Sequence, residues 1–257
     1  MDIYISQLDE TKKVLPIIEK YDVGLEVVQF ASPFILDDKK TYIESYKKEL
    51  GDILNYIDIS IHGPFADLIP GSRDNMIRKI TDYRFEQSYY VAKALNAKKI
   101  VYHHGYTPKT YSNTEWLNNS NKFWNNFLKN KLDDIQIHIE NTLEDDYFLI
   151  NKAITEVNNP NFSVCLDIGH VNVYSHLGVN KWIYELGDKI KHMHIHNNYG
   201  DKDSHSSIIK GNMNIIEILN LVKEKYNDTS ISLEIVNTKE LEESLEILYE
   251  HGLVKKR

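Results

Sequence analysis

Short β-branched or aromatic runs alternate with longer segments of helical period along the whole chain. Strands are expected at residues 2–6, 23–28, 56–62, 98–103, 135–140, 162–167, 189–196 and 230–235. Helices are expected around residues 8–20, 40–50, 75–95, 114–128, 145–157, 181–186, 214–225 and 239–249. This alternation is typical of βα units around a parallel sheet, and eight such pairs predict a closed (β/α)8 TIM barrel.

Composition favours a single domain. The chain has 257 residues, of which 42% are hydrophobic and 26% are charged, so it can bury a complete core. A barrel of this length is ordinarily one domain, and no proline- or glycine-rich linker interrupts the pattern. We therefore expect one barrel domain over residues 1–257.

The charge and the cysteine content restrict the partners and the cellular setting. A formal net charge of −8 disfavours broad attraction to nucleic-acid phosphates. Cys165 is the single cysteine and cannot form an intrachain disulfide. No run approaches the roughly 18 apolar residues that span a bilayer, and no cationic, apolar leader follows Met1. We expect a cytoplasmic protein without a membrane partner; the oligomeric state is left open.

Acidic and histidine residues stand at or near the ends of six predicted strands. In a parallel barrel these ends converge on one rim, which carries the active-site loops. One such residue alone is ordinarily solvated or hydrogen-bonded, but burying several carboxylates together is costly without a cation. The pattern therefore predicts a metal site built from His62, His103, Glu140, Asp167, His194 and Glu234.

Three further residues extend this set. Asp167 and His170 form a D-x-x-H spacing that can place both side chains on one side of a tight turn. Asp203 and His205 form a D-x-H spacing that places both on one face of an extended loop. Mixed imidazole and carboxylate ligands suit zinc, manganese or iron better than calcium. We expect one to three such ions.

These segments resemble the xylose isomerase-like TIM barrel superfamily, which includes sugar phosphate isomerases and epimerases and endonuclease IV (AP endonuclease family 2). The resemblance lies in SIHGPFADL, VYHHGY, IHIENT, VCLDIGH, KHMHIHNN, DKDSH and SLEI. It implies that all nine residues match ligands of a three-metal cluster in endonuclease IV. It also implies that Glu140, Asp167, His194 and Glu234 match the single-metal site of ketose epimerases.

The resemblance leaves the reaction divided. This chain has His194-Ile195-His196-Asn197 where the endonucleases typically have His-Leu-Asn-Asp, and it lacks their glycine pair after D-x-H. We therefore favour a metal-dependent isomerase or epimerase of a sugar or sugar phosphate. The resemblance implies a metal-stabilised enediolate, with Glu140 and Glu234 as the acid/base pair. The alternatives are an abasic-site phosphodiesterase acting on DNA and a non-catalytic barrel that binds metal or sugar.

Several other residues have suitable chemistry but are assigned elsewhere. His138 and His192 lie deeper in their strands, where packed histidines are expected, and His176 falls in a predicted helical segment. His196 shares strand parity with His194, so periodicity does not choose between them, and only the resemblance favours His194. Left outside the predicted site for these reasons, or because a structural role is expected, are His104, His138, His176, His192, His196, Glu26, Trp116, Trp124 and Phe127.

Overall fold

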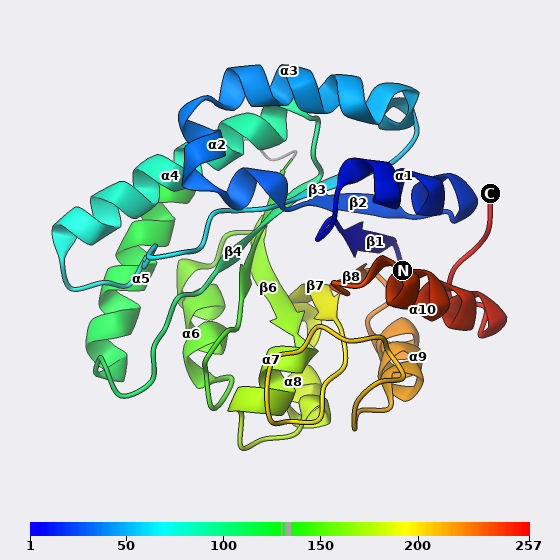
Figure 1. Ribbon diagram of the computed structural model, residues 1–257. Coiled ribbons are helices and arrows are strands. Elements are labelled where there is room, and N and C mark those ends of the chain that lie inside the picture. The colour runs from blue at the N-terminus through cyan, green and yellow to red at the C-terminus, as the bar shows by residue number, and fades with distance from the viewer. Residues whose placement is uncertain (130, 132–134) are drawn as a thin grey trace.

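The chain folds into a closed barrel of eight parallel strands, arranged in sequence order (Figure 1). The computed structural model describes residues 1–129, 131 and 135–257. The strands are β1 (Ile3–Ser6), β2 (Gly24–Val27), β3 (Ile59–His62), β4 (Lys99–His103), β5 (Gln136–Glu140), β6 (Phe162–Asp167), β7 (Ile190–Ile195) and β8 (Ser230–Leu233). The predicted (β/α)8 TIM barrel is therefore confirmed.

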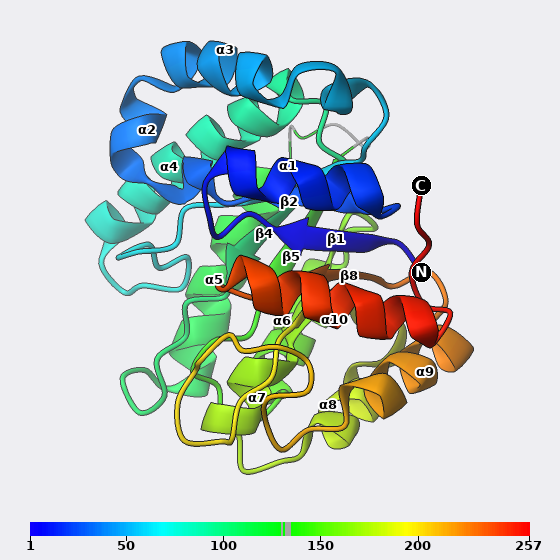
Figure 2. The same cartoon turned by 45° about the vertical axis from the view of Figure 1, so that its right-hand side comes forward.

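Helices form a ring outside the strands (Figures 1 and 2). The α-helices are α1 (Thr11–Lys20), α2 (Pro33–Asp37), α3 (Lys39–Leu50), α4 (Asn75–Ala94), α5 (Asn113–Leu128), α6 (Phe148–Val157), α7 (Ile168–Tyr174), α8 (Val179–Leu186), α9 (Ile215–Lys225) and α10 (Thr238–Glu250). Short 3-10 turns are η1 (Gln29–Ala31), η2 (Gly51–Asn55) and η3 (Gly187–Lys189). Hydrophobic periodicity does not predict α2 and α7, because helices of five and seven residues contain too few turns to show a helical repeat.

The strands alternate between an apolar outer face and a polar inner face. In β1, for example, Ile3 and Ile5 join the hydrophobic core, which also contains Val14, Ile17 and Ile18 of α1. Each fully buried aliphatic side chain of this kind contributes about 1.5–3 kcal/mol. The core thus lies between the strands and the helices, and it leaves the inner face of the strands free for polar groups.

Polar side chains fill the barrel interior, where branched aliphatic residues are usual. Ser6 donates a hydrogen bond to Glu26 Oε1 (2.9 Å) and Ser60 donates one to Glu26 Oε2 (3.1 Å). Lys99 donates to Ser230 across the barrel. These contacts connect β1 and β3 to β2, and β4 to β8, inside the barrel.

Both ends of the chain lie at the end of the barrel opposite to the carboxyl-terminal rim of the strands (Figure 1). The backbone N–H of Arg257 donates to the carbonyl of Lys20 (3.0 Å), and Tyr21 and Lys256 form an isolated antiparallel bridge. Figure 2 shows α1 and α10 on either side of β1, so the first and last units close the ring. No helix among the described residues is long and apolar enough to cross a membrane.

Candidate metal centre

The strand ends bring the nine predicted ligands together at one rim. His62, His103, Glu140 and Asp167 are the last residues of their strands. The others lie in β7, directly after β8, in the first turn of α7 and in the β7–α9 loop: His194, Glu234, His170, Asp203 and His205. Their convergence follows from the common direction of the strands. Their role as ligands stays a prediction.

Glu140, at the end of β5, faces two histidines from β3 and β4. Its Oε2 atom is 3.4 Å from His62 Nε2 and 3.5 Å from His103 Nε2. The Phe65 ring stacks on His103 with 4.6 Å between the ring centroids. This group presents one carboxylate oxygen and two imidazole nitrogens to a common point.

His194 faces three carboxylates with its Nδ1 atom. Nδ1 is 3.4 Å from Glu140 Oε1, 3.5 Å from Glu234 Oε1 and 3.9 Å from Asp167 Oδ2. Glu140 is thus shared, because its two oxygens face different groups of donors. All four residues are buried, with exposed fractions between 0% and 5%.

The third group consists of His170, Asp203 and His205. Asp203 Oδ2 is 3.2 Å from His170 Nε2 and 3.0 Å from His205 Nε2. The tight turn expected for D-x-x-H is the first turn of α7, where Asp167 caps the helix by accepting from the His170 N–H (2.7 Å). The prediction that D-x-H lies in an extended loop is wrong at His205, because the backbone there is left-handed, with a φ of +44°.

Several buried atoms in this cluster have no hydrogen-bond partner. They are Glu140 Oε2, Asp167 Oδ2, Asp203 Oδ1, and both ring nitrogens of His194 and of His196. The contacts around them have ion-pair distances without hydrogen-bond geometry. A buried polar group without a partner costs about 1–3 kcal/mol. Since these atoms are carboxylate oxygens and imidazole nitrogens that face one another, the donor set fits a divalent cation.

The electrostatics of the cluster point the same way. Burial raises the pKa of Glu140, but His194 and His103 outweigh it and hold the pKa well below its usual value. Burial lowers the pKa of His194, but the surrounding acidic groups, Glu234 among them, raise it well above its usual value. Burial lowers the pKa of His103 to about 3, so its imidazole is neutral. The cluster therefore attracts positive charge.

Two residues outside the predicted site belong to the same region. Glu26 is fully buried inside the barrel, with Oε1 3.1 Å from His194 Nε2. His196 is also fully buried, and its Nε2 is 3.3 Å from Asp167 Oδ1. Strand parity is the signal for both residues. Glu26 has an inward position in β2, and His196 has the same parity as His192 and His194, which point inward from β7. Parity gives the face of a strand but not the depth inside the barrel.

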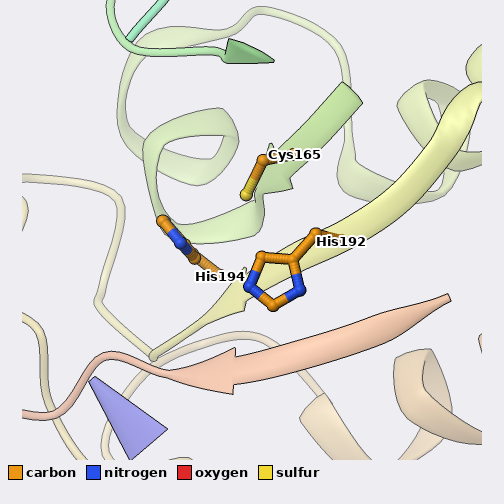
Figure 3. Close-up of side chains that lie close together, drawn as sticks. All are labelled: Cys165, His192 and His194. Atoms are coloured by element: carbon orange, nitrogen blue, oxygen red, sulfur yellow. The ribbon is translucent and has the colours of Figure 1, made fainter. Parts of the chain in front are cut away.

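Cys165 and His192 also lie close to His194 (Figure 3). Burial raises the pKa of the Cys165 thiol far above its usual value, so the thiol is uncharged. His192 already hydrogen-bonds Ser230 through Nδ1 (2.8 Å) and Glu26 through Nε2 (3.1 Å). Metals bind the thiolate, so this group is a poorer candidate than the rim.

The remaining histidines have structural partners or lie apart. His104 hydrogen-bonds Glu144 (2.8 Å) and accepts from the Trp116 indole (3.2 Å), and His138 hydrogen-bonds Ser163 (2.6 Å). The prediction that His176 lies in a helix is wrong, because this residue lies between α7 and α8, where it is exposed. Trp116, Trp124 and Phe127 are buried, as expected for core residues.

A cavity of about 380 Å³ adjoins the cluster at His103 and His170. Its apolar lining residues include Phe65, Leu68 and Leu143, and its polar lining residues include Thr107 and Thr142. A small polar molecule can therefore reach the donor atoms from this side. Two other cavities, of about 560 and 740 Å³, contain none of the nine predicted ligands.

Comparison with known proteins gives the following similarities. The family model described as "Xylose isomerase-like TIM barrel" matches residues 21–251. The uncharacterized protein MJ1311 of Methanocaldococcus jannaschii is 32% identical over 217 residues, which are 80% of this chain and 73% of that protein. A crystal structure of a D-tagatose 3-epimerase-like protein has a TM-score of 0.79 and 27% identity, covering 98% of this chain and 97% of that chain. The TTHB071 protein from Thermus thermophilus, soaked with ZnCl2, has a TM-score of 0.77 and 22% identity, covering 97% of each chain.

Proposed function

We propose, from the premise that the chain belongs to the xylose isomerase-like TIM barrel family, that it is a divalent-metal-dependent isomerase or epimerase of unphosphorylated hydroxy-carbonyl sugars. One observation carries this proposal. Glu140 and Glu234 are buried carboxylates that flank His194 Nδ1 at 3.4 and 3.5 Å. Paired carboxylates beside a cation site are suited to moving a proton from and to carbon.

The donor atoms around His194 Nδ1 would hold the catalytic cation. These atoms come from Glu140, Asp167, His194 and Glu234. A bound divalent cation supplies a Lewis acid to adjacent oxygens of the substrate and stabilises the negative charge that develops there. The solved structure of a similar barrel soaked with ZnCl2 supports zinc as the first ion to test.

The protein's own part is to accept and return a proton. Glu140 or Glu234, as the carboxylate, would take a proton from the carbon next to the carbonyl, and the opposing group, as the carboxylic acid, would supply one to the carbon of the product. Burial keeps water away from both groups, with exposed fractions of 1% and 5%. Phe65 packs against the rings of His103 and His62 beside the cavity.

The lining of the cavity supports a neutral substrate. Among its described lining residues none is lysine or arginine, and Asp67 adds a negative charge. A phosphate group prefers arginine or lysine partners, whereas the hydroxyls of Thr107 and Thr142 suit sugar hydroxyls. The similarity to a D-tagatose 3-epimerase-like protein makes ketohexoses the first substrates to test.

The test is exchange of a carbon-bound proton. Metal-free protein is loaded with Zn²⁺ or Mn²⁺ and incubated in D₂O with a panel of unphosphorylated ketohexoses that includes D-tagatose. Deuterium incorporation and formation of a new sugar are followed by NMR. We expect Glu234→Gln to lower the exchange rate by about 10²–10⁴-fold, because it removes one proton-transfer group.

Glu243→Gln is the matched control, since Glu243 is exposed on α10 and outside the cluster. This variant should exchange at the rate of the unchanged protein. If the metal-loaded protein incorporates no deuterium into any sugar of the panel, the proposed function is wrong.

A phosphodiesterase acting at abasic sites in DNA is the second candidate. The observation that favours it is the presence of three adjacent donor groups, with Glu140 shared between two of them. Three metal equivalents by elemental analysis, together with cleavage of a duplex containing an abasic site, would support this candidate. One equivalent without cleavage would support the sugar chemistry. Metal binding without exchange or cleavage would support a non-catalytic barrel.

A further inference from the structure

We propose that His196 is a further metal ligand, binding through Nε2 a cation that it shares with Asp167 and Asp203. This inference rests on the metal dependence of the proposed function and extends the predicted ligand set from nine residues to ten. His196 directly follows β7 and lies on the same inner face as His194. It connects the donor group around His194 with the group around His205.

The distances place His196 among carboxylates. Its Nε2 atom is 3.3 Å from Asp167 Oδ1 and 3.5 Å from Asp203 Oδ1. One donor atom each of His196, His205 and Glu234 also lie within 4.8 Å of one another. Asp203 thus faces His196 with Oδ1, while its Oδ2 faces His170 and His205.

Burial makes this arrangement costly without a cation. The side chain of His196 is 0% exposed, and neither ring nitrogen has a hydrogen-bond partner. Asp203 Oδ1, which faces it, also has none. The packed histidine His104, by contrast, satisfies both ring nitrogens, with Glu144 and Trp116. His196 instead presents a free nitrogen to two acidic side chains, as a metal ligand does.

The surrounding structure holds the ring in place. The His205 ring stacks on it, with 4.0 Å between centroids and 16° between the planes. Gly169 makes room at its edge, since a Cβ there would lie 1.9 Å from His196 Cε1. A ligand whose rotamer is fixed before binding loses less entropy when the cation arrives.

The experiment compares His196→Gln with His104→Gln. Glutamine keeps a polar group near Asp167 but removes the imidazole nitrogen. Metal-free proteins are titrated with Zn²⁺ against a competing chelator, and the Co²⁺-loaded proteins are compared by visible spectroscopy and X-ray absorption. We expect His196→Gln to lower the affinity for one metal equivalent at least about tenfold and to remove one imidazole from the metal environment. His104→Gln should keep both.

The melting temperature separates a ligand from a structural residue. If His196 is a ligand, His196→Gln should lower the melting temperature more in Zn²⁺ than in chelator. An equal loss in both conditions, or an unchanged zinc affinity and Co²⁺ spectrum, would overturn the inference while leaving the proposed function intact. Absence of any metal binding by the unchanged protein would overturn both the inference and the proposed metal dependence.

Discussion

At the scale of single residues, Glu140 belongs to two donor groups. Glu26 contacts His194, the histidine of one of these groups, from inside the barrel. Glu26 Oε1 is 3.1 Å from His194 Nε2 and Oε2 is 3.1 Å from His192 Nε2. Burial raises the pKa of Glu26, but His194 and His192 hold it well below its usual value. An ionised Glu26 beside Nε2 leaves Nδ1 of His194 to face the rim carboxylates.

Glu26→Gln therefore tests the support of His194. The substitution keeps the size of the side chain and removes its charge, so His194 loses the group that orients its ring. We expect zinc affinity to fall about 10–100-fold, measured by competition with a chelator. Ser60→Ala should have a smaller effect, because it removes only the hydrogen bond that Ser60 donates to Glu26 Oε2. Equal affinities for Glu26→Gln and the unchanged protein would rule out this role.

Lys99 gives a prediction about pH. Burial lowers its pKa from the usual 10.5, although Asp2 and Glu26 oppose this. The unfolded chain therefore binds more protons between the lowered pKa and 10.5, so this contribution to stability rises with pH in that window. Below this window Lys99 is charged in both the folded and the unfolded state, and the full cost of burying its charge lowers the stability. Ser230, its partner, also bonds His192 and Lys191.

Lys99→Met should accordingly raise the free energy of unfolding at pH 7. The gain should shrink as the pH approaches 10.5, because the lysine of the unchanged protein then loses its charge in both states. Urea denaturation of both proteins at pH 7 and pH 10 provides the measurement. A variant that is less stable by the same amount at both values would contradict the prediction.

At the scale of elements, the junction of β6 and α7 is the tightest part of the site. Gly169 lies in the first turn of α7, and a Cβ there would overlap the His196 ring. Helix propensity alone would favour alanine over glycine by about 1 kcal/mol. The overlap with a buried ring opposes this gain and forces the ring or the helix to move.

Gly169→Ala should destabilise the protein by about 1–3 kcal/mol, measured by urea denaturation of the metal-free form. It should also weaken zinc binding, because His196 is displaced. Gly178→Ala is the control at the start of α8, where a Cβ meets nothing within 4 Å. Comparable losses for the two variants would mean that the overlap is not the cause.

At the scale of the whole molecule, the cluster joins strands from β3 to β8, so a bound cation should stabilise the complete barrel. Binding to the folded state alone adds about 2.7 kcal/mol when the free metal is 100 times the dissociation constant. For a chain of this size we expect the melting temperature to rise by roughly 5–10 °C. Calorimetry with Zn²⁺, Ca²⁺ and chelator is the test. Ca²⁺ should give a smaller shift, since it prefers oxygen ligands.

The sequence determined the barrel and the predicted ligand set. Alternating apolar and polar residues in eight strands specify which side chains point inward, and a parallel barrel brings the strand ends to one rim. His62, His103, Glu140, Asp167, His194 and Glu234 could therefore be named without coordinates. The short helix α7 and the left-handed backbone at His205 could not, because neither produces a periodic pattern.

Only the tertiary structure decided how deep each inward residue lies. His192, His194 and His196 have the same parity and follow one another towards the rim, but which residues of the other strands each one faces depends on the stagger of those strands. The register aligns His194 with Asp167 and with Ser232, after an irregularity between Val164 and Cys165. That stagger places His192 on Glu26, His194 at the rim carboxylates and His196 between Asp167 and Asp203. A two-residue period carries no information about stagger, which arises from packing around the closed barrel.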